Sequence, residues 1–178
     1  MTNKTYKLDA AHSSIDFQVK HMMISKVKGT FQTFSAELNM DVTDLTTADI
    51  KFTIQADSIK TKQEARDEHL KSADFFNVEN NPTIDFVATT ITKTAEDEYK
   101  MIGDLTLVGV TKPISFDVEF AGQSKNPMDG SIVAGFSADA KISRKAFGIE
   151  YNAALETGGV LIGDEIKISV ELEVIAER

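Results

Sequence analysis

The chain has 178 residues, of which 42% are hydrophobic and 26% are charged, a composition typical of one globular domain and not of a disordered chain. It contains no cysteine, which excludes disulfides, thiol nucleophiles and cysteine-ligated metal sites. The formal net charge of -9 disfavours nucleic acid as a partner. No apolar run is long enough to cross a membrane as a helix, so no stable membrane insertion is expected. The N-terminal residues lack a secretory signal, and a cytoplasmic location is therefore expected if Met1 is the natural start.

The first third of the chain alternates apolar and polar residues with a period of two, which is typical of strands with one face in the core. The first such run covers residues 15–21 and places His21 on the inward face. A second run, 27–40, changes parity near Gln32 and Thr33, which predicts a bulge within one long strand. A third run covers residues 48–56.

One stretch after these strands has the spacing of a helix instead. Residues Thr61 to Glu64 fit a capping box, and Arg66 and His69 then fall on one helical face with apolar neighbours. Outside that face, Asp67 and Lys71 have the spacing of an i,i+4 ion pair. The pattern predicts a helix from about Thr61 to about Ser72.

Five further alternating runs predict the remaining strands, at residues 84–88, 99–107, 114–120, 132–142 and 166–174. Turn-forming residues separate the runs, and turns are predicted at 41–47, 80–82, 111–113, 123–130 and Gly158-Gly159. About eight strands that are each apolar on one side cannot all be covered in an open sheet. We therefore predict an all-β fold, an antiparallel barrel of about eight strands with one inserted α-helix, formed by residues 1–178 as a single domain.

The interior of such a barrel is either filled by side chains or open to one small ligand. The inward rows contain small residues that are expected to leave room inside, namely Gly29, Ala36, Ala56, Ala88, Gly103, Ala134, Ala138 and Ala140. Eleven phenylalanines and no tryptophan suit the wall of a dry tunnel, because phenylalanine brings no polar atom that needs a partner. For any single inward residue ordinary core packing is the better explanation, and only the group as a whole favours a tunnel.

Six blocks of sequence then resemble one known family in order and spacing. They are Asp9-Ala10-Ala11-His12-Ser13 with Phe17, His21 and Gly29-Thr30-Phe31; Ser58-Ile59-Lys60-Thr61; Arg66-Asp67-Glu68-His69-Leu70 with Asp74-Phe75-Phe76; Gly103-Asp104-Leu105-Thr106-Leu107-Val108-Gly109-Val110-Thr111-Lys112; Ser143-Arg144-Lys145-Ala146-Phe147-Gly148; and Gly163-Asp164-Glu165. Together they cover nearly the whole chain, and they resemble the YceI-like proteins.

The resemblance implies an extended lipocalin-like barrel whose interior binds a long-chain apolar molecule: a polyisoprenoid or its diphosphate, a quinone tail, or a fatty-acid derivative such as a fatty amide. It also implies a homodimer, because members are often dimeric. Many members carry a secretory signal, which this sequence lacks, so a role in periplasmic isoprenoid traffic is not carried over. The expected function is binding, sequestration or transport of such a ligand, with no catalytic residue, metal or cofactor.

The predicted ligand-binding residues come from the inward rows and from the helix. They are Phe17, Val19, His21, Phe31, Phe52, Ile54, Arg66, His69, Phe76, Phe86, Leu105, Leu107, Phe116, Val118, Phe136 and Phe147.

Arg66 has two alternative interpretations, because a guanidinium on the apolar face of a helix needs a charged partner. In the first, it pairs with a carboxylate and fastens the helix across the barrel opening. The candidate carboxylates are Asp9, Asp74 and Asp164. In the second, Arg66, Arg144 and His69 line an anion site for a diphosphate or another polar head group.

Two other classes of protein stay open as alternatives. The first is a His-metal-dependent enzyme, because His12, His21 and His69 could ligate a metal with Asp9, Asp16, Asp67 or Asp164, although their spacing fits no metal motif. The trio Asp9, His12 and Ser13 would suit a hydrolase, but residues this close in sequence point in different directions and no oxyanion-hole motif accompanies them. The second alternative is a ligand-free stress-response scaffold with a packed interior.

Overall fold

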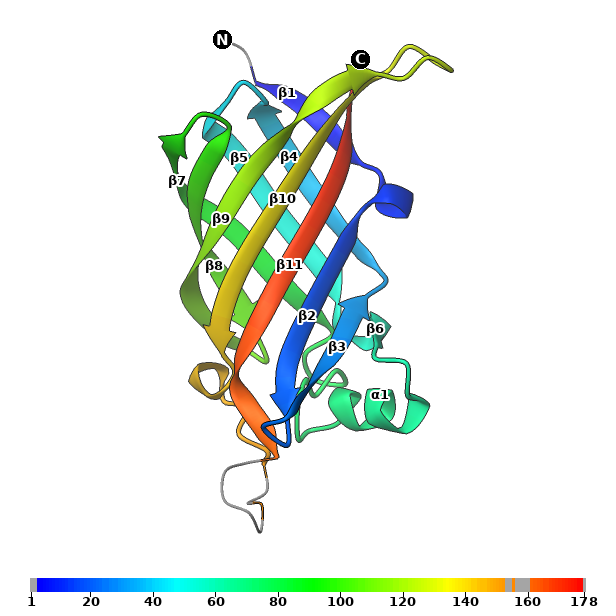
Figure 1. The fold of residues 1–178 in the computed structure, drawn as a ribbon, viewed down its shortest axis with the longest axis vertical. Coiled ribbons are helices and arrows are strands. Elements are labelled where there is room, and N and C mark those ends of the chain that lie inside the picture. Colours follow the sequence, from blue (N-terminus) through cyan, green and yellow to red (C-terminus); the bar gives the residue numbers. More distant parts are fainter. Residues whose placement is uncertain (1–2, 153–154, 156–160, 178) are drawn as a thin grey trace.

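The computed structural model describes residues 3–152, 155 and 161–177, and its fold is shown in Figure 1. The strands are β1 (Lys4–Leu8), β2 (Ser14–His21), β3 (Ser25–Phe31), β4 (Phe34–Asp41), β5 (Asp44–Gln55), β6 (Ile59–Lys60), β7 (Thr83–Ala95), β8 (Glu98–Leu107), β9 (Val110–Lys125), β10 (Ile132–Ser143) and β11 (Ile162–Ala176). The helical elements are α1 (Glu64–Lys71) and the single-turn 3-10 helices η1 (Ala10–His12), η2 (Ala56–Ser58) and η3 (Lys145–Phe147).

The strands that the structure describes close into an antiparallel barrel. Eight of them form a ring in the order β1-β4-β5-β7-β8-β9-β10-β11, and β1 pairs back onto β11. The long strand β11 has two partners on that side, because its residues 174–176 pair with β1 and its residues 162–171 pair with β2. β1 and β2 thus continue each other along one wall, and β4 and β3 do the same along the next. The predicted eight-stranded barrel with one helix is confirmed.

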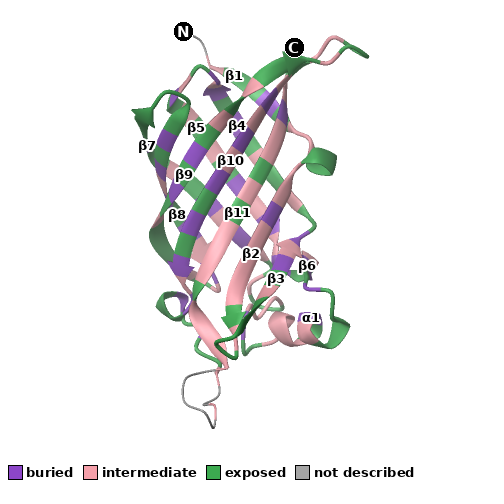
Figure 2. Cartoon of the chain, in the orientation of Figure 1, coloured by how far each residue is buried: buried purple, intermediate pink, exposed green. Residues whose placement is uncertain are grey.

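Alternation along the strands explains why the barrel closes. Figure 2 shows buried residues at every second position along β8 and most of β10, separated by exposed or intermediate ones. Because successive side chains of a strand point to opposite faces, each strand sends every second residue into the interior. The single bulged strand predicted over residues 27–40 is instead two strands, since the chain leaves β3 at Gln32 and Thr33 and enters β4, which has other partners.

Two inward glycines serve the packing of neighbouring rings and do not leave empty space. A Cβ at Gly29 would lie 2.3 Å from the ring of Phe17, its cross-strand partner in β2. A Cβ at Gly103 would lie 2.4 Å from the ring of Phe86, which sits in β7 next to β8. Both contacts are far inside van der Waals distance, so the expectation that these glycines make room for a ligand is wrong. They make room for phenylalanine.

Several local predictions differ from the structure. α1 begins at Glu64, three residues after the expected start at Thr61, and β1 was not predicted at all. The turn expected at 111–113 lies inside β9, because the chain reverses at Val108 and Gly109, both of which have positive φ. Pro113 fits the strand because β9 there pairs with β8 only, its pairing with β10 beginning at Asp117. The turn expected at Gly158-Gly159 lies outside the described residues.

Candidate functional site

A cavity of about 360 Å³ lies inside the barrel. Every strand of the ring except β1 contributes to its wall, together with β2, β3 and the segment around α1. All but one of the predicted ligand-binding residues line it: Phe17, Val19, His21, Phe31, Phe52, Ile54, Arg66, His69, Phe76, Phe86, Leu105, Leu107, Phe116, Val118 and Phe136. The volume lies within the range of sites that hold small apolar molecules.

Phe147 does not line the cavity. It is 1% exposed but belongs to η3, a 3-10 turn that follows the end of β10. The alternation that points strand residues inward does not extend into such a turn. Phe147 is therefore core, and its prediction as a cavity-lining residue is wrong.

The two ends of the cavity differ in exposure. At the end remote from α1, the lining residues Leu38, Met40 and Leu45 are at most 3% exposed. At the other end the lining includes Tyr151, which is 38% exposed, and His69, whose side chain is 41% exposed. The cavity thus opens beside α1, at the lower end of the molecule in Figure 1. We call this end the α1 opening.

A chain of hydrogen bonds fixes the position of α1. The buried carboxylate of Asp67 accepts from the backbone N–H of Thr61 at 2.8 Å and from its hydroxyl at 2.5 Å. Arg66 donates from Nε to the Thr61 hydroxyl at 2.8 Å and from Nη2 to the Thr61 carbonyl. The predicted capping box is therefore not formed, because the Thr61 hydroxyl bonds to a side chain and Gln63 is the N-cap.

These bonds favour the structural interpretation of Arg66, with a different partner from the one expected. Its guanidinium is held by Thr61, and no ion pair between described residues links it to Asp9, Asp74 or Asp164. The expected pair of Asp67 with Lys71 is wrong too, since Lys71 lies 3.3 Å from Glu68 and Asp67 bonds Thr61.

His69 is the centre of an aromatic cluster at the α1 opening. Its Nε2 lies 2.8 Å from the Asp74 carboxylate. Its ring makes edge-to-face contacts with Phe75 and Tyr151, at centroid distances of 5.0 and 4.9 Å. Because a carboxylate already occupies one side of His69, an anionic head group placed there would meet repulsion from Asp74.

Arg144 lies on the opposite side of the opening and is 3% exposed. It donates to the backbone carbonyls of Gly163, Ile149, Tyr151 and Ile162 at 2.8 to 3.1 Å. Burial lowers the pKa of this guanidinium from its ordinary value, while the nearby Asp164 opposes that shift. Arg144 lines the cavity with a side chain that uses four of its five N–H donors on backbone carbonyls, so it fastens these segments and offers little to an anion.

Asp164 binds the segment on either side of Arg144, through Ser143 and Lys145. Burial raises its pKa, but hydrogen bonds from the Ser143 hydroxyl at 2.6 Å and the Lys145 N–H at 3.0 Å hold the pKa below its ordinary range. Its backbone carbonyl also accepts from the Arg144 N–H. The sequence blocks around residues 143–148 and 163–165 therefore meet in one hydrogen-bonded unit.

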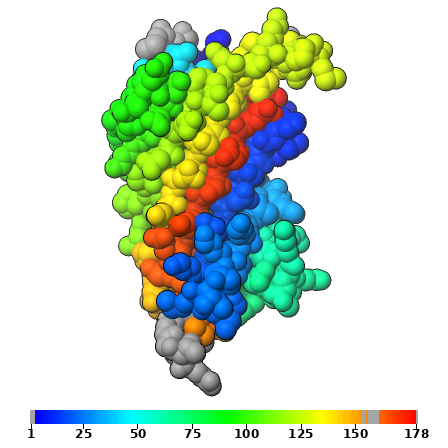
Figure 3. Space-filling view, in the orientation of Figure 1, coloured from blue at the N-terminus to red at the C-terminus, as the bar shows by residue number. Residues whose placement is uncertain are grey.

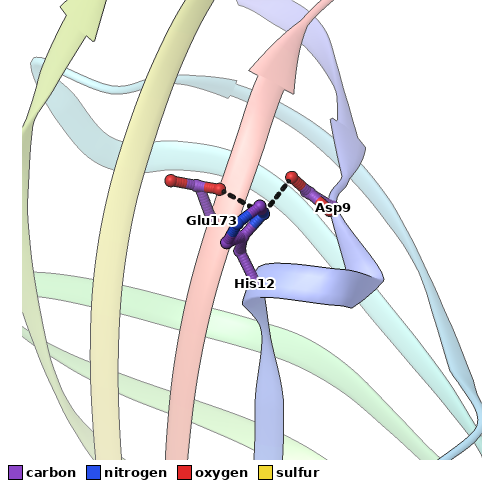
Figure 4. Close-up of side chains that lie close together, drawn as sticks. All are labelled: Asp9, His12 and Glu173. Carbon is purple, nitrogen blue, oxygen red and sulfur yellow. Dashed lines mark hydrogen bonds and ion pairs between the residues drawn. The ribbon is translucent and has the colours of Figure 1, made fainter.

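A third polar cluster joins η1 to β11 on the outer surface (Figure 4). Nδ1 of His12 lies 2.8 Å from the Asp9 carboxylate and 3.1 Å from that of Glu173. The hydrogen bond to Asp9, together with both carboxylate charges, raises the pKa of His12 above its ordinary value of 6.5. The bond to His12 correspondingly lowers the pKa of Asp9 from 3.8.

This cluster is the group of described residues whose geometry could hold a metal ion, since their ligand atoms lie within 4.8 Å of one another. His12 already uses Nδ1 to bind both carboxylates, which is ordinary ion-pair geometry. The cluster also lies outside the barrel, away from the residues that line the cavity. Of the metal ligands considered from the sequence, His21 and His69 line the cavity instead, so the structure does not bring the three histidines together.

The Ser13 hydroxyl is bonded to the backbone of β11 and not to His12, so His12 does not activate it as a nucleophile. Its hydroxyl accepts from the Glu173 N–H at 3.0 Å and faces the Glu173 carbonyl at 3.4 Å. The Asp9 N–H also donates to that carbonyl, at 2.9 Å. The block from Asp9 to Ser13 thus binds one residue of β11, at the point where β11 changes partner from β2 to β1.

The Asp9–His12–Glu173 cluster should make stability depend on pH. A raised His12 pKa contributes stability that is complete below 6.5 and is lost as the pH rises through the folded-state pKa. The lowered Asp9 pKa contributes stability above 3.8 that is lost as the pH falls. We therefore expect His12→Gln to lower the urea midpoint most between these two pH values, and progressively less above 6.5.

The control for this measurement is His21→Gln, because His21 lies outside the cluster. A His12→Gln effect of the same size at every pH from 4 to 9 would contradict the assignment.

Some residues of the site had no signal in the sequence. Glu173 is a polar residue in the alternating run 166–174, and alternation cannot show that it meets His12 some 160 positions earlier in the chain. Tyr151 follows β10 in a stretch without periodicity, and only the fold brings it to His69.

Of the described helices, none is long and apolar enough to cross a membrane.

Comparison with known proteins places this architecture among relatives. A family model described as YceI-like domain matches residues 6–174. A UPF0312 protein of Staphylococcus aureus is 48% identical over 173 residues, which is 97% of each chain. The solved Campylobacter jejuni YceI protein is 33% identical, with a TM-score of 0.76 and coverage of 96% of this chain and 97% of that one.

Two solved structures with lower identity are similar in fold alone. Burkholderia cenocepacia BcnA is 22% identical, with a TM-score of 0.81 and coverage of 93% of this chain and 98% of its own. A polyisoprenoid binding domain from Saccharophagus degradans is 15% identical, with a TM-score of 0.70 and coverage of 98% and 99%.

Proposed function

The chain belongs to the YceI-like family, and from this premise we propose that it binds one long-chain apolar molecule inside the barrel, to carry or sequester it without chemical change. The observation that carries the proposal is the cavity, whose wall is built almost wholly from aliphatic and phenylalanine side chains. A bound chain would gain up to about 0.8 kcal/mol for each methylene removed from water, less the entropy lost on immobilisation.

A polyisoprenoid is the ligand class that we place first. A domain of similar fold is described as polyisoprenoid binding, which supports this class. The wall offers tilted and edge-to-face rings, such as Phe17 with Phe31 and Phe86 with Phe116, at centroid distances of 5.7 and 5.1 Å. Quinone tails and fatty-acid derivatives are the next candidates, because they present similar apolar chains.

We propose that the ligand enters tail first and leaves its head at the α1 opening. There the polar atoms of Arg66 bond Thr61 and those of Arg144 bond backbone carbonyls, while His69 faces Asp74. An uncharged head, such as an alcohol or a quinone, suits this arrangement better than a diphosphate, which would have to displace existing bonds.

A homodimer and a cytoplasmic location stay predictions.

Catalysis is not part of the proposal. The cluster that could hold a metal is outside the barrel, and the Ser13 hydroxyl is bonded to the backbone of β11. The polar residues around the cavity hold loops and α1 in place.

A series of straight-chain alcohols of increasing length tests the function. We expect the dissociation constant of the delipidated protein to fall with each added methylene, by up to about fourfold, until the cavity is full. The matching prenols and prenyl diphosphates then separate the head groups, and the prenols should bind more tightly. An affinity that does not change with chain length would contradict an apolar tunnel.

A further inference from the structure

The hairpin between β2 and β3 carries an unusual apolar tip. Its three turn residues are Met22, Met23 and Ile24, which are 42%, 57% and 85% exposed. Three consecutive large apolar side chains in water are not explained by the packing of the barrel, because they contribute little to its core.

The backbone of the turn makes this choice of residues more notable. Met22 and Met23 both have positive φ, at 53° and 63°. This left-handed conformation is unfavourable for residues with a Cβ, and turns of this kind normally carry Asn and Gly. The tip therefore retains apolar side chains where the turn itself favours small polar residues.

The two strands that carry the tip have an excess of lysine over acidic residues, opposite to the net charge of the chain as a whole. Lys20 faces Lys26 across the hairpin and Lys28 pairs with Gln18, and like charges directly opposite each other destabilise a strand pair. The next strand adds Lys167 beside Gln18. Glu165 lies on the same part of β11, and Asp16 lies two residues farther from the tip on β2. No ion pair between described residues engages Lys20, Lys26 or Lys28.

The tip also lies at the α1 opening. The Met22 N–H donates to the carbonyl of Leu161 at 2.7 Å, and both Leu161 and His21 line the cavity. Figure 3 shows residues of this hairpin, in blue, on the surface at the lower end of the molecule, beside the segment of α1. The apolar tip, the lysines and the opening therefore share one end.

We propose that the β2–β3 hairpin docks the protein on a bilayer surface that contains anionic lipids, with the tip among the head groups and the lysines against the lipid phosphates. Exposed apolar residues next to cations are the combination that binds such surfaces reversibly. The net charge of -9 repels an anionic surface elsewhere on the molecule, so the docking orientation is set by this hairpin. The α1 opening then faces the membrane, from which an apolar chain can enter the cavity without crossing water.

The experiment is cosedimentation of the full chain with vesicles, without cargo added. Vesicles of phosphatidylcholine are compared with an equimolar mixture of phosphatidylcholine and phosphatidylglycerol. We expect binding to the mixed vesicles, weakened as salt is raised, and a loss of roughly fivefold for each lysine changed in Lys20→Ser, Lys26→Ser and Lys28→Ser.

The apolar part is tested by the triple variant Met22→Asn, Met23→Gly, Ile24→Ser. These residues suit a turn with positive φ, so the variant should fold at least as well as the natural chain but bind mixed vesicles at least tenfold more weakly. The matched control is Met128→Ser with Ile132→Ser, because these residues are 93% and 39% exposed near the β9–β10 turn, at the other end of the barrel.

Equal binding to both kinds of vesicle, or an unchanged affinity of the triple variant, would overturn the proposal. So would no vesicle binding at all, which would leave another protein as the partner of the tip. Failure here would not touch the proposed cargo binding, since the alcohol series measures that without a membrane.

Discussion

Replacing Ala138 by phenylalanine should abolish retention of a long-chain ligand while the barrel stays folded. Ala138 is 8% exposed and lines the cavity from β10, between Val118 of β9 and Val170 of β11. A ring added there extends into the existing space, so the overpacking cost should fall at the low end of about 1 to 3 kcal/mol. A ring that displaces even two methylenes of the ligand should weaken binding more than about tenfold.

The matched control is Ala121→Phe, the same change at an exposed position of β9. Both variants are titrated with the longest alcohol of the series that the natural protein binds, and thermal unfolding checks that each is folded. Undiminished affinity of a folded Ala138→Phe variant would show that the ligand does not occupy this part of the barrel.

The second large effect should come from Arg144→Gln, and it should fall on stability. Four backbone carbonyls accept hydrogen bonds from this guanidinium, a buried one of Ile149 and partly buried ones of Gly163, Tyr151 and Ile162. Glutamine can replace at most two of the donors, the Ile162 carbonyl keeps its bond from the Asn152 amide, and each carbonyl left without a partner costs about 1 to 3 kcal/mol. We expect a loss of about 2 kcal/mol in the free energy of unfolding, and a Tm lower by roughly 4 to 8 °C.

Urea denaturation followed by circular dichroism measures this loss, and Lys145→Gln is the control because its side chain is exposed and its backbone N–H makes the bond to Asp164. Arg144→Lys should recover little of the stability, since an ammonium cannot reach carbonyls on several sides of a planar fork. A Tm within about 2 °C of the natural protein would show that the segments at residues 149–151 and 162–163 do not depend on Arg144.

The barrel could be predicted because its cause is local. Alternation of apolar and polar residues predicts each strand, as it does from Ile166 to Val174. Strands that are apolar on one face only can cover those faces in few ways, and a closed barrel is one of them. The same alternation identified the cavity wall, because inward residues of a barrel must share one interior. Its limits are equally physical: it fails at Phe147, where the chain leaves the strand for a 3-10 turn.

The partners in the polar clusters could not be predicted, because neither alternation nor charge shows which group a polar side chain meets in the fold. Arg66 needed a partner, and charge alone suggested carboxylates, but the fold placed the hydroxyl and carbonyl of Thr61 within reach. His12 finds Glu173 only because β11 runs past η1. The prediction that small inward residues leave room for a ligand is wrong at Gly29, because a ring from the neighbouring strand fills the space beside it.

The three polar clusters have a common effect on the interior. Asp9–His12–Glu173 holds the wall where β1 passes into β2, Thr61–Arg66–Asp67 holds α1, and Arg144–Asp164 holds the loops opposite. In the described part of the chain no buried side-chain nitrogen or oxygen lacks a hydrogen-bond partner. Polar groups are thus satisfied at the periphery of the barrel, which leaves the cavity wall apolar.

The central claim is that the cavity holds an apolar chain, and native mass spectrometry of the protein before and after extraction with organic solvent tests it most directly. The account predicts that the protein as purified carries one additional mass of several hundred daltons per chain, that extraction removes it, and that a prenol added to the extracted protein restores one equivalent. A protein that shows only the mass of its own chain, and takes up no prenol after extraction, would contradict the account.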